Sequence, residues 1–163
     1  MHVFRLPVIK RLFPNAKIIF AVRHPCDVIL SCFMQHFRAP DFALLCKDIP
    51  TLAATYRRTF DFWHSQQELL QADVLELRYE LFVDDFEPNT RRVFDFLGLP
   101  WDPAVLSPAA RAHEKRFIST PSYAQVVQPI NARAVGRWRN YEAHFTESLP
   151  TLMPYLERWN YSS

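Results

Sequence analysis

Residues 16–32 read AKIIFAVRHPCDVILSC, and the order of apolar and polar residues in this stretch decides the fold. The run IIFAV is apolar without alternation, which is typical of a parallel-sheet strand covered on both faces. Arg23 follows this run directly, and Pro25 suits the first turn of a helix. The stretch therefore predicts a strand over 17–23 and a helix over about 25–37.

The remainder of the chain predicts more helices and one more strand. Residues 73–79 (DVLELRY) have the apolar composition of a second buried strand. Helices are expected over 3–13, from Pro50 to about 70, from near Pro88 to Leu97, and over about 146–160. Gly98 is expected to form a left-handed helix cap, and residues 100–135 are expected to be mostly irregular, with a short helix after Pro103. Strands separated by long helical crossovers pair in parallel, which predicts an α/β fold.

The number of strands and the number of glycines are both low. Most sheets have four to six strands, so two strands predict half of a sheet whose other strands are missing. The chain has two glycines, Gly98 and Gly136, where average usage would give about eleven. A loop that cradles phosphate needs glycines where the backbone turns tightly, so we expect none in this chain.

Composition excludes several classes of protein. The 163 residues suffice for one domain, and a net charge of +2 with only isolated basic pairs argues against nucleic-acid binding. The three cysteines lack a CxxC pattern, which indicates free thiols in a reducing compartment, and we expect a cytoplasmic protein. No His and Cys residues have zinc-ligand spacing, and no apolar run is long enough to span a membrane.

Arg23 is the candidate binding residue. The carboxyl end of a parallel strand is where open α/β sheets bind ligands, and a helix N-terminus beside it adds free N–H groups and partial positive charge. Ser31 shares the polar face of the helix with Asp27 and Gln35, so its hydroxyl can add to a site for a dianionic phosphate. The alternative is that Arg23 pairs with Asp27 or Glu80 and that Ser31 only fills space. The residues alone leave both interpretations open.

Several segments resemble sulfotransferases that use 3′-phosphoadenosine 5′-phosphosulfate (PAPS). Residues 23–37 (RHPCDVILSCFMQHF) are similar to the family's 3′-phosphate-binding segment, and 12–19 (LFPNAKII) to the lead-in before it. Residues 77–103 resemble the family's strand-Tyr-Glu segment and the helix that follows. Residues 119–138 (STPSYAQVVQPINARAVGRW) resemble the distal segment that closes over the co-substrate. These segments occur in the family's order, nearest to a bacterial TPR-linked, tyrosylprotein-sulfotransferase-like branch.

The resemblance assigns residues to the co-substrate. Arg23 and Ser31 match the two ligands of the 3′-phosphate, and Tyr79 falls where the family often places a nucleotide contact. Ser122 and Arg137 match positions at which tyrosylprotein-type enzymes bring a Ser and a basic residue to PAPS. No metal is implied.

The resemblance also implies that parts of the family's domain are absent. The implied fold is a P-loop NTPase-like parallel sheet with flanking helices, in which residues 1–163 are the C-terminal portion of a single sulfotransferase domain. The N-terminal strand and the phosphate loop with its catalytic Lys are missing. His2 lies a few positions past the family's upstream catalytic stretch, so the catalytic residues stay unknown. We expect the chain alone to be inactive and to self-associate through the exposed sheet edge.

The predicted function is therefore that of a sulfotransferase. It moves a sulfuryl group from PAPS to an acceptor hydroxyl, and this chain supplies the half that binds the 3′-phosphate and the nucleotide. The alternative is a non-catalytic nucleotide-binding or interaction module derived from that fold. A nucleotide kinase-like fold is disfavoured, because the Arg-Pro-Asp and Gly-Arg-Trp segments would then be coincidences.

Overall fold

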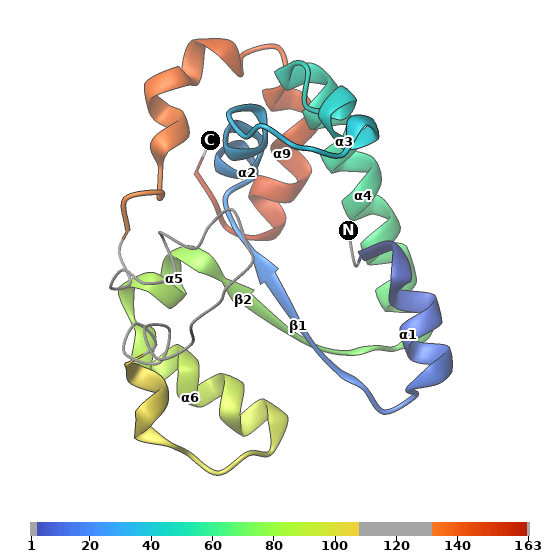
Figure 1. The fold of residues 1–163 in the computed structure, drawn as a ribbon, viewed down its shortest axis with the longest axis vertical. Coiled ribbons are helices and arrows are strands. Elements are labelled where there is room, and N and C mark those ends of the chain that lie inside the picture. The colour runs from blue at the N-terminus through green and yellow to red at the C-terminus, as the bar shows by residue number, and fades with distance from the viewer. Residues whose placement is uncertain (1–2, 108–131, 163) are drawn as a thin grey trace.

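The computed structural model describes residues 3–107 and 132–162, which form helices around a small sheet (Figure 1). The elements are, in chain order, η1 (Val3–Arg5), α1 (Leu6–Leu12), β1 (Lys17–Val22), α2 (Pro25–Phe33), α3 (Pro40–Leu45), α4 (Ile49–Leu70), β2 (Asp73–Arg78), α5 (Tyr79–Asp84), α6 (Phe86–Leu97), η2 (Pro103–Leu106), η3 (Arg137–His144) and α9 (Leu149–Arg158). The predicted mixture of helices and strands is confirmed.

The two predicted strands form a parallel pair. β1 and β2 pair in register from Lys17 opposite Asp73 to Val22 opposite Arg78, and α2, α3 and α4 make the crossover between them. The predicted parallel pairing is therefore confirmed for the described residues. Because the strands run in the same direction, their carboxyl ends lie together, and the segments after Val22 and Arg78 meet there.

Within the described residues, helices cover one face of β1, which corrects the expectation of cover on both. Phe20 and Val22 are buried, whereas Lys17, Ile19 and Ala21 on the opposite face are exposed. The buried face packs against helices, and α6 approaches the other face only near the start of β1, where Lys17 Nζ donates to the Phe96 carbonyl at 2.6 Å. Ile19 keeps 40% of its surface exposed as a result.

Local chemistry explains most helix boundaries. Asp48 caps α4 by accepting a hydrogen bond from the Thr51 N–H at 2.7 Å. Gly98 ends α6 at a φ of +73°, and the Leu99 N–H bonds the Phe94 carbonyl across the cap, so the predicted left-handed cap is confirmed.

Several predicted boundaries differ from the structure. α2 ends at Phe33 rather than near residue 37, because the next residues turn back and Phe37 packs edge-on against Phe42 of α3. The second strand ends at Arg78, and the unpredicted α5 begins at Tyr79. The unpredicted η3 lies before α9, which is shorter than expected.

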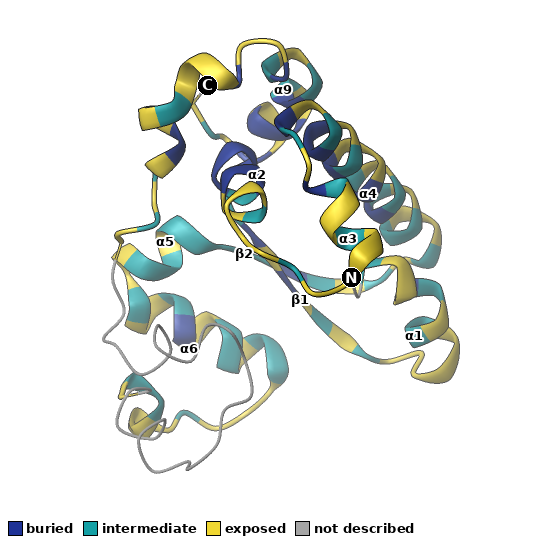
Figure 2. Cartoon of the chain, turned by 45° about the horizontal axis from the view of Figure 1, so that its top comes forward, coloured by how far each residue is buried: buried dark blue, intermediate teal, exposed yellow. Residues whose placement is uncertain are grey.

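The hydrophobic core lies between β1 and the helices α2, α4 and α9. Phe20 of β1 stacks on Trp63 of α4 with 4.1 Å between ring centroids, and Trp159 completes the aromatic cluster. Figure 2 shows the buried residues on the sides of α2, α4 and α9 that face one another. This packing holds the end of β1 and the start of α2 in a fixed relation, which is where the candidate site lies.

Candidate functional site

Arg23 follows β1 and is held on several sides. Its Nη2 donates to the Ala134 carbonyl at 2.5 Å and lies 3.8 Å from Asp27 Oδ2, while its guanidinium carbon lies 5.3 Å from the centre of the Tyr79 ring. The side chain is 23% exposed, and its buried Nε–H has no hydrogen-bond acceptor among the described residues. Arg23 thus has a donor that no described residue uses, and the exposed part of its guanidinium lies at the carboxyl edge of the sheet, where a ligand oxygen could reach it.

Asp27 is buried beneath the segment 134–138. Its side chain is 0% exposed, its Oδ2 accepts from the Gly136 N–H at 2.7 Å, and its Oδ1 accepts from the Trp138 N–H at 2.9 Å. Asp27 was predicted to lie on the polar face of the helix. The structure places it on the α2 face that this distant segment covers, so the pairing with Arg23 that we considered as the alternative is present.

The start of α2 does not offer all the free N–H groups that we expected. His24 caps the helix, because its Nδ1 accepts from the Cys26 N–H at 3.2 Å. The His24 N–H itself donates to Glu80 Oε1 at 2.9 Å. The expectation is therefore wrong for these two amides, because protein acceptors already bind them. The helix dipole still contributes partial positive charge at this end.

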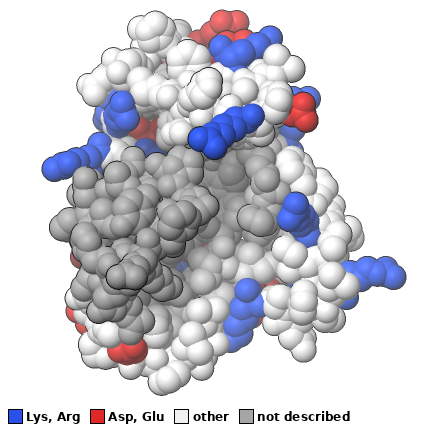
Figure 3. All heavy atoms as spheres, viewed as in Figure 1, with Lys and Arg blue, Asp and Glu red and all other residues white. Residues whose placement is uncertain are grey.

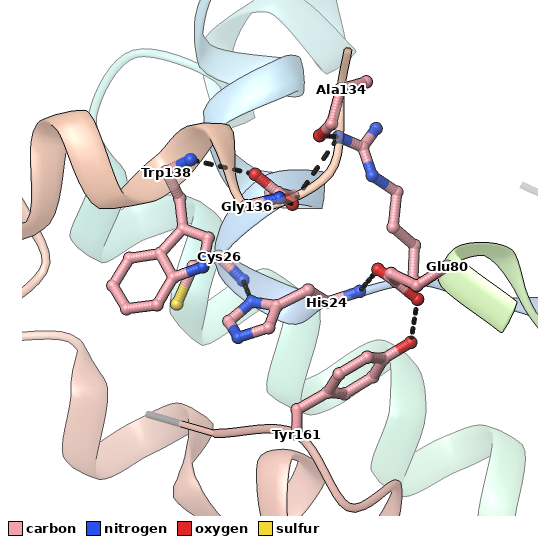
Figure 4. Close-up of polar contacts among 9 residues, drawn as sticks. His24, Cys26, Glu80, Ala134, Gly136, Trp138 and Tyr161 are labelled. Carbon is pink, nitrogen blue, oxygen red and sulfur yellow. Dashed lines mark hydrogen bonds and ion pairs between the residues drawn. The ribbon is translucent and has the colours of Figure 1, made fainter. Parts of the chain in front are cut away.

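A buried polar network joins His24 to the segment after α9. Figure 4 shows Glu80 between the backbone of His24 and the Tyr161 hydroxyl, which donates to Glu80 Oε2 at 2.5 Å. His24 Nε2 lies 3.0 Å from the Ser162 carbonyl, and its ring stacks on Trp138 with 5.0 Å between centroids. The alternative pairing of Arg23 with Glu80 is not what the structure has, since both carboxylate oxygens of Glu80 have other donors.

Burial sets the protonation of this network. Burial lowers the pKa of His24, although its hydrogen bond to Ser162 and the charges of Asp27 and Glu80 oppose the shift. Burial and the Asp27 charge raise the pKa of the Cys26 thiol to about 12, so Cys26 is an unreactive thiol. His24 therefore packs as a neutral ring.

Ser31 and Arg137 lie along the same side of α2 as Asp27. Asp27, Ser31 and Met34 are spaced by four and three residues, which places them on one helix face. Arg137 is exposed, and its Nη2 lies 3.4 Å from the Met34 sulfur. The exposed Ser31 lies on this face between Asp27, which binds the Gly136 N–H, and Met34, which Arg137 contacts. The structure thus brings Arg23, Ser31 and Arg137 to one side of α2.

The other candidate residues have different outcomes. Tyr79 is half-buried at the start of α5 and packs under the Arg23 guanidinium. Ser122 and His2 lie outside the described residues. Whether any of these residues contacts a nucleotide stays a prediction.

Two residues that organise the site have roles that the sequence does not indicate. Asp27 and Glu80 are predicted as alternative ion-pair partners of Arg23, yet they bind backbone N–H groups and a tyrosine hydroxyl from distant segments. Their partners lie 56 to 111 residues away, so no local spacing could indicate them. The one available hint was Gly136, because glycine is rare in this chain and marks a special turn.

On the face that Figure 3 shows, the described Lys and Arg side chains form separate groups and not one continuous patch. Within residues 3–107 and 132–162, no three His, Cys, Asp or Glu side chains are grouped as metal ligands. None of the helices in the described ranges is both long and apolar enough to cross a bilayer. All three cysteines are free thiols.

Comparison with known proteins connects this geometry to one family. A family model described as "Sulfotransferase family" matches residues 1–103, which include Arg23, Ser31 and Tyr79 but not Arg137. A protein-tyrosine sulfotransferase of Drosophila melanogaster is 27% identical over 145 residues, and protein-tyrosine sulfotransferase 2 of Gallus gallus is 24% identical over 172. An omega-hydroxy-beta-dihydromenaquinone-9 sulfotransferase of Mycobacterium tuberculosis is 33% identical over 108 residues.

The matches differ in how much of each chain they cover. They include 78%, 94% and 60% of this chain, respectively. They include 26%, 42% and 27% of the relatives, so this chain spans less than half the length of each.

Proposed function

This chain belongs to the sulfotransferase family, and from that premise we propose that it provides the part of a PAPS-dependent sulfotransferase that binds the 3′-phosphate and the nucleotide. The observation that carries the proposal is Arg23. A partly exposed guanidinium, whose buried Nε–H has no partner in residues 3–107 and 132–162, lies at the carboxyl edge of a parallel sheet, beside a helix N-terminus and within the matched region. This is a site that a phosphate oxygen would complete.

The residues have separate roles in this proposal. Arg23 provides a forked, permanently charged donor for the 3′-phosphate, and Ser31 adds a hydroxyl from the next turns of α2. Arg137 approaches from the distal segment, and the Tyr79 ring supports the Arg23 guanidinium. All four act by positioning the co-substrate and not by proton transfer.

When bound, PAPS supplies the sulfuryl group that is transferred. We place an acceptor hydroxyl opposite it, because the names of the relatives include a tyrosine and an omega-hydroxy quinone, both of which offer a hydroxyl group. This chain's own contribution is to hold the nucleotide end far from the sulfur, so that the reacting end has a fixed direction.

The positions of the glycines support the proposal that this chain binds the nucleotide and that a phosphate loop outside it binds the phosphosulfate. Gly98 ends α6 and Gly136 begins η3, so neither of the chain's two glycines follows a strand. The same observation supports the second candidate function, a nucleotide-binding module without transfer. Transfer of labelled sulfate from PAPS by the 163-residue chain tests what the two candidates share: both predict no turnover, so turnover would contradict both.

Calorimetric titration with adenosine 3′,5′-bisphosphate tests the binding site itself. We expect the wild-type chain to bind the bisphosphate. Arg23→Ala should lose about 2 to 4 kcal/mol of binding free energy, because it removes the desolvated pair between the guanidinium and the 3′-phosphate. Arg91→Ala is the matched control, since Arg91 is an exposed arginine on α6 that pairs with Glu87. Equal affinities of the wild type and Arg23→Ala would refute the assignment of Arg23.

A further inference from the structure

We infer that Asp27 is a positioning residue of this site, whose buried carboxylate holds the segment 134–138 against α2 and thereby fixes where Arg23 and Arg137 lie. The inference rests on the proposed function, because it assigns a role in binding the 3′-phosphate. Asp27 would not contact the ligand, and its charge is negative, whereas the side chains that bind phosphate are positive.

The burial of Asp27 requires an explanation. A fully buried carboxylate has lost its hydration, which costs several kcal/mol unless hydrogen bonds and charges replace the water. Asp27 receives the N–H groups of Gly136 and Trp138 at 2.7 and 2.9 Å, one on each oxygen, and it lies in the first turn of α2, where the helix dipole favours negative charge. The carboxylate is therefore specifically bound by the distal segment.

The two hydrogen bonds fix the residue between them. Gly136 and Trp138 flank Arg137, so both neighbours of Arg137 are attached to the same carboxylate. Gly136 makes this possible with a φ of +66°, which turns the backbone so that both N–H groups point at Asp27. The Arg137 side chain leaves the backbone at a defined place and reaches along α2 to Met34.

The same carboxylate leaves Arg23 available for a ligand. Its distance of 3.8 Å from Arg23 Nη2 exceeds that of a hydrogen bond, whereas its two backbone N–H donors lie at 2.7 and 2.9 Å. Arg23 is bound more closely by the Ala134 carbonyl, which belongs to the segment that Asp27 holds. Asp27 thus positions Arg23 mainly through this segment, and it does not neutralise Arg23 in a tight ion pair.

The test compares two nucleotides that differ in one phosphate. The wild type, Asp27→Asn and Asp61→Asn are titrated with adenosine 3′,5′-bisphosphate and with adenosine 5′-monophosphate. An asparagine oxygen can accept from one of the two N–H groups, but its NH₂ faces the other donor. One of the two residues that flank Arg137 therefore loses its hydrogen bond. We expect Asp27→Asn to lower the preference for the bisphosphate about tenfold, while the affinity for the monophosphate stays unchanged. Asp61→Asn removes an equal charge on α4, where Asp61 accepts from Tyr155, and should leave both affinities unchanged.

The outcomes separate this inference from the proposed function. If the wild type does not prefer the bisphosphate, both fail together. If it does and Asp27→Asn keeps or increases that preference, only the inference fails, because an Asp27 that merely repels anions would give tighter binding once neutralised. A merely structural Asp27 would weaken the binding of both nucleotides equally.

A second pair of variants covers the case in which Asp27→Asn does not fold. Gly136→Ala strains the positive φ in the held segment, with no atom closer than 3.8 Å to the added carbon. Gly98→Ala applies the same strain at the end of α6, where φ is +73°. We expect only Gly136→Ala to lower the bisphosphate preference, and an equal effect of both variants would overturn the inference.

Discussion

His24 and Ser162 are 138 residues apart in the sequence, yet His24 Nε2 lies 3.0 Å from the Ser162 carbonyl oxygen. On the other side of the ring, Nδ1 accepts from the Cys26 N–H. A carbonyl can only accept and an amide N–H can only donate, so the ring carries its proton on Nε2 and is neutral. One imidazole thus caps α2 and anchors the segment after α9 at the same time.

Stability should therefore fall in mild acid. Burial lowers the pKa of His24 below its ordinary 6.5, and burial together with Arg158 lowers the pKa of His64 to about 4. Between the folded and unfolded pKa values the unfolded chain binds more protons, so stability rises with pH. The contribution of the two histidines to the free energy of unfolding is fully present above about pH 6.5. It is lost as the pH falls through their pKa values in the folded state.

The variant His24→Asn measures how much of the stability loss in acid comes from His24. Asparagine is a good N-cap without a titrating group, so the helix start is kept. Urea unfolding at several pH values between 7.5 and 4.5 should show a smaller loss of stability in this variant than in the wild type, while His64 titrates in both. Parallel pH curves for the two proteins would show that His24 contributes nothing to the acid sensitivity.

Tyr161 and Glu80 should be energetically coupled. Burial and the hydrogen bond to Glu80 raise the pKa of the Tyr161 hydroxyl, which therefore stays a donor at all pH values of interest. Tyr161→Phe leaves one carboxylate oxygen without its donor and should cost about 1 to 3 kcal/mol of unfolding free energy. A double-mutant cycle with Glu80→Gln should give an interaction energy above about 0.5 kcal/mol, whereas strictly additive effects would argue that the contact is energetically silent.

Arg137→Ala should weaken the binding of adenosine 3′,5′-bisphosphate without unfolding the chain. Arg137 is exposed, so its removal leaves the core intact, and we expect a loss of about tenfold in affinity and a weaker dependence on salt. Arg139→Ala is the control, because Arg139 is an exposed neighbour that instead donates to the Ser162 hydroxyl. Equal affinities of the two variants would remove Arg137 from the site.

The isolated chain should self-associate through the uncovered face and edge of β1. Ile19 is 40% exposed on that face, and Leu12 and Phe13 just before the strand are 66% and 64% exposed. Exposed apolar surface beside a strand edge promotes association. Sedimentation velocity at increasing concentration should show oligomers of the wild type and fewer of Ile19→Lys. A wild type that stays monomeric at all concentrations would contradict this expectation.

The sequence predicts those elements whose cause is local. The apolar runs gave both strands, and the glycine after Leu97 gave the end of α6, because each depends on neighbouring residues alone. α5 could not be predicted in this way. The chain leaves the strand at Tyr79, and Glu80 turns to the His24 N–H, a partner 56 residues away.

The candidate site is predictable in its charges but not in its contacts. Arg23 and its strand-end position follow from the order of the residues in 16–32. That Asp27 is buried follows from the segment 134–138, which folds onto α2 from far along the chain. That the His24 N–H is not free follows from Glu80, 56 residues away. Periodicity places Asp27 on the polar face of a helix, and only the tertiary fold decides that this face is covered.

The contact between His24 and Ser162 also dictates when the site is built during synthesis. A ribosome makes residue 24 and then 138 more residues before the carbonyl that binds its ring exists. Until residue 138 is made, α2 has neither Gly136 nor Trp138 beside it, and the Asp27 carboxylate stays hydrated. Contacts of such long separation close last, and the aromatic core residues beside them are accessible to chaperones until then. Pauses in translation before residue 132 would therefore lengthen the time for which the carboxyl edge of the sheet is exposed.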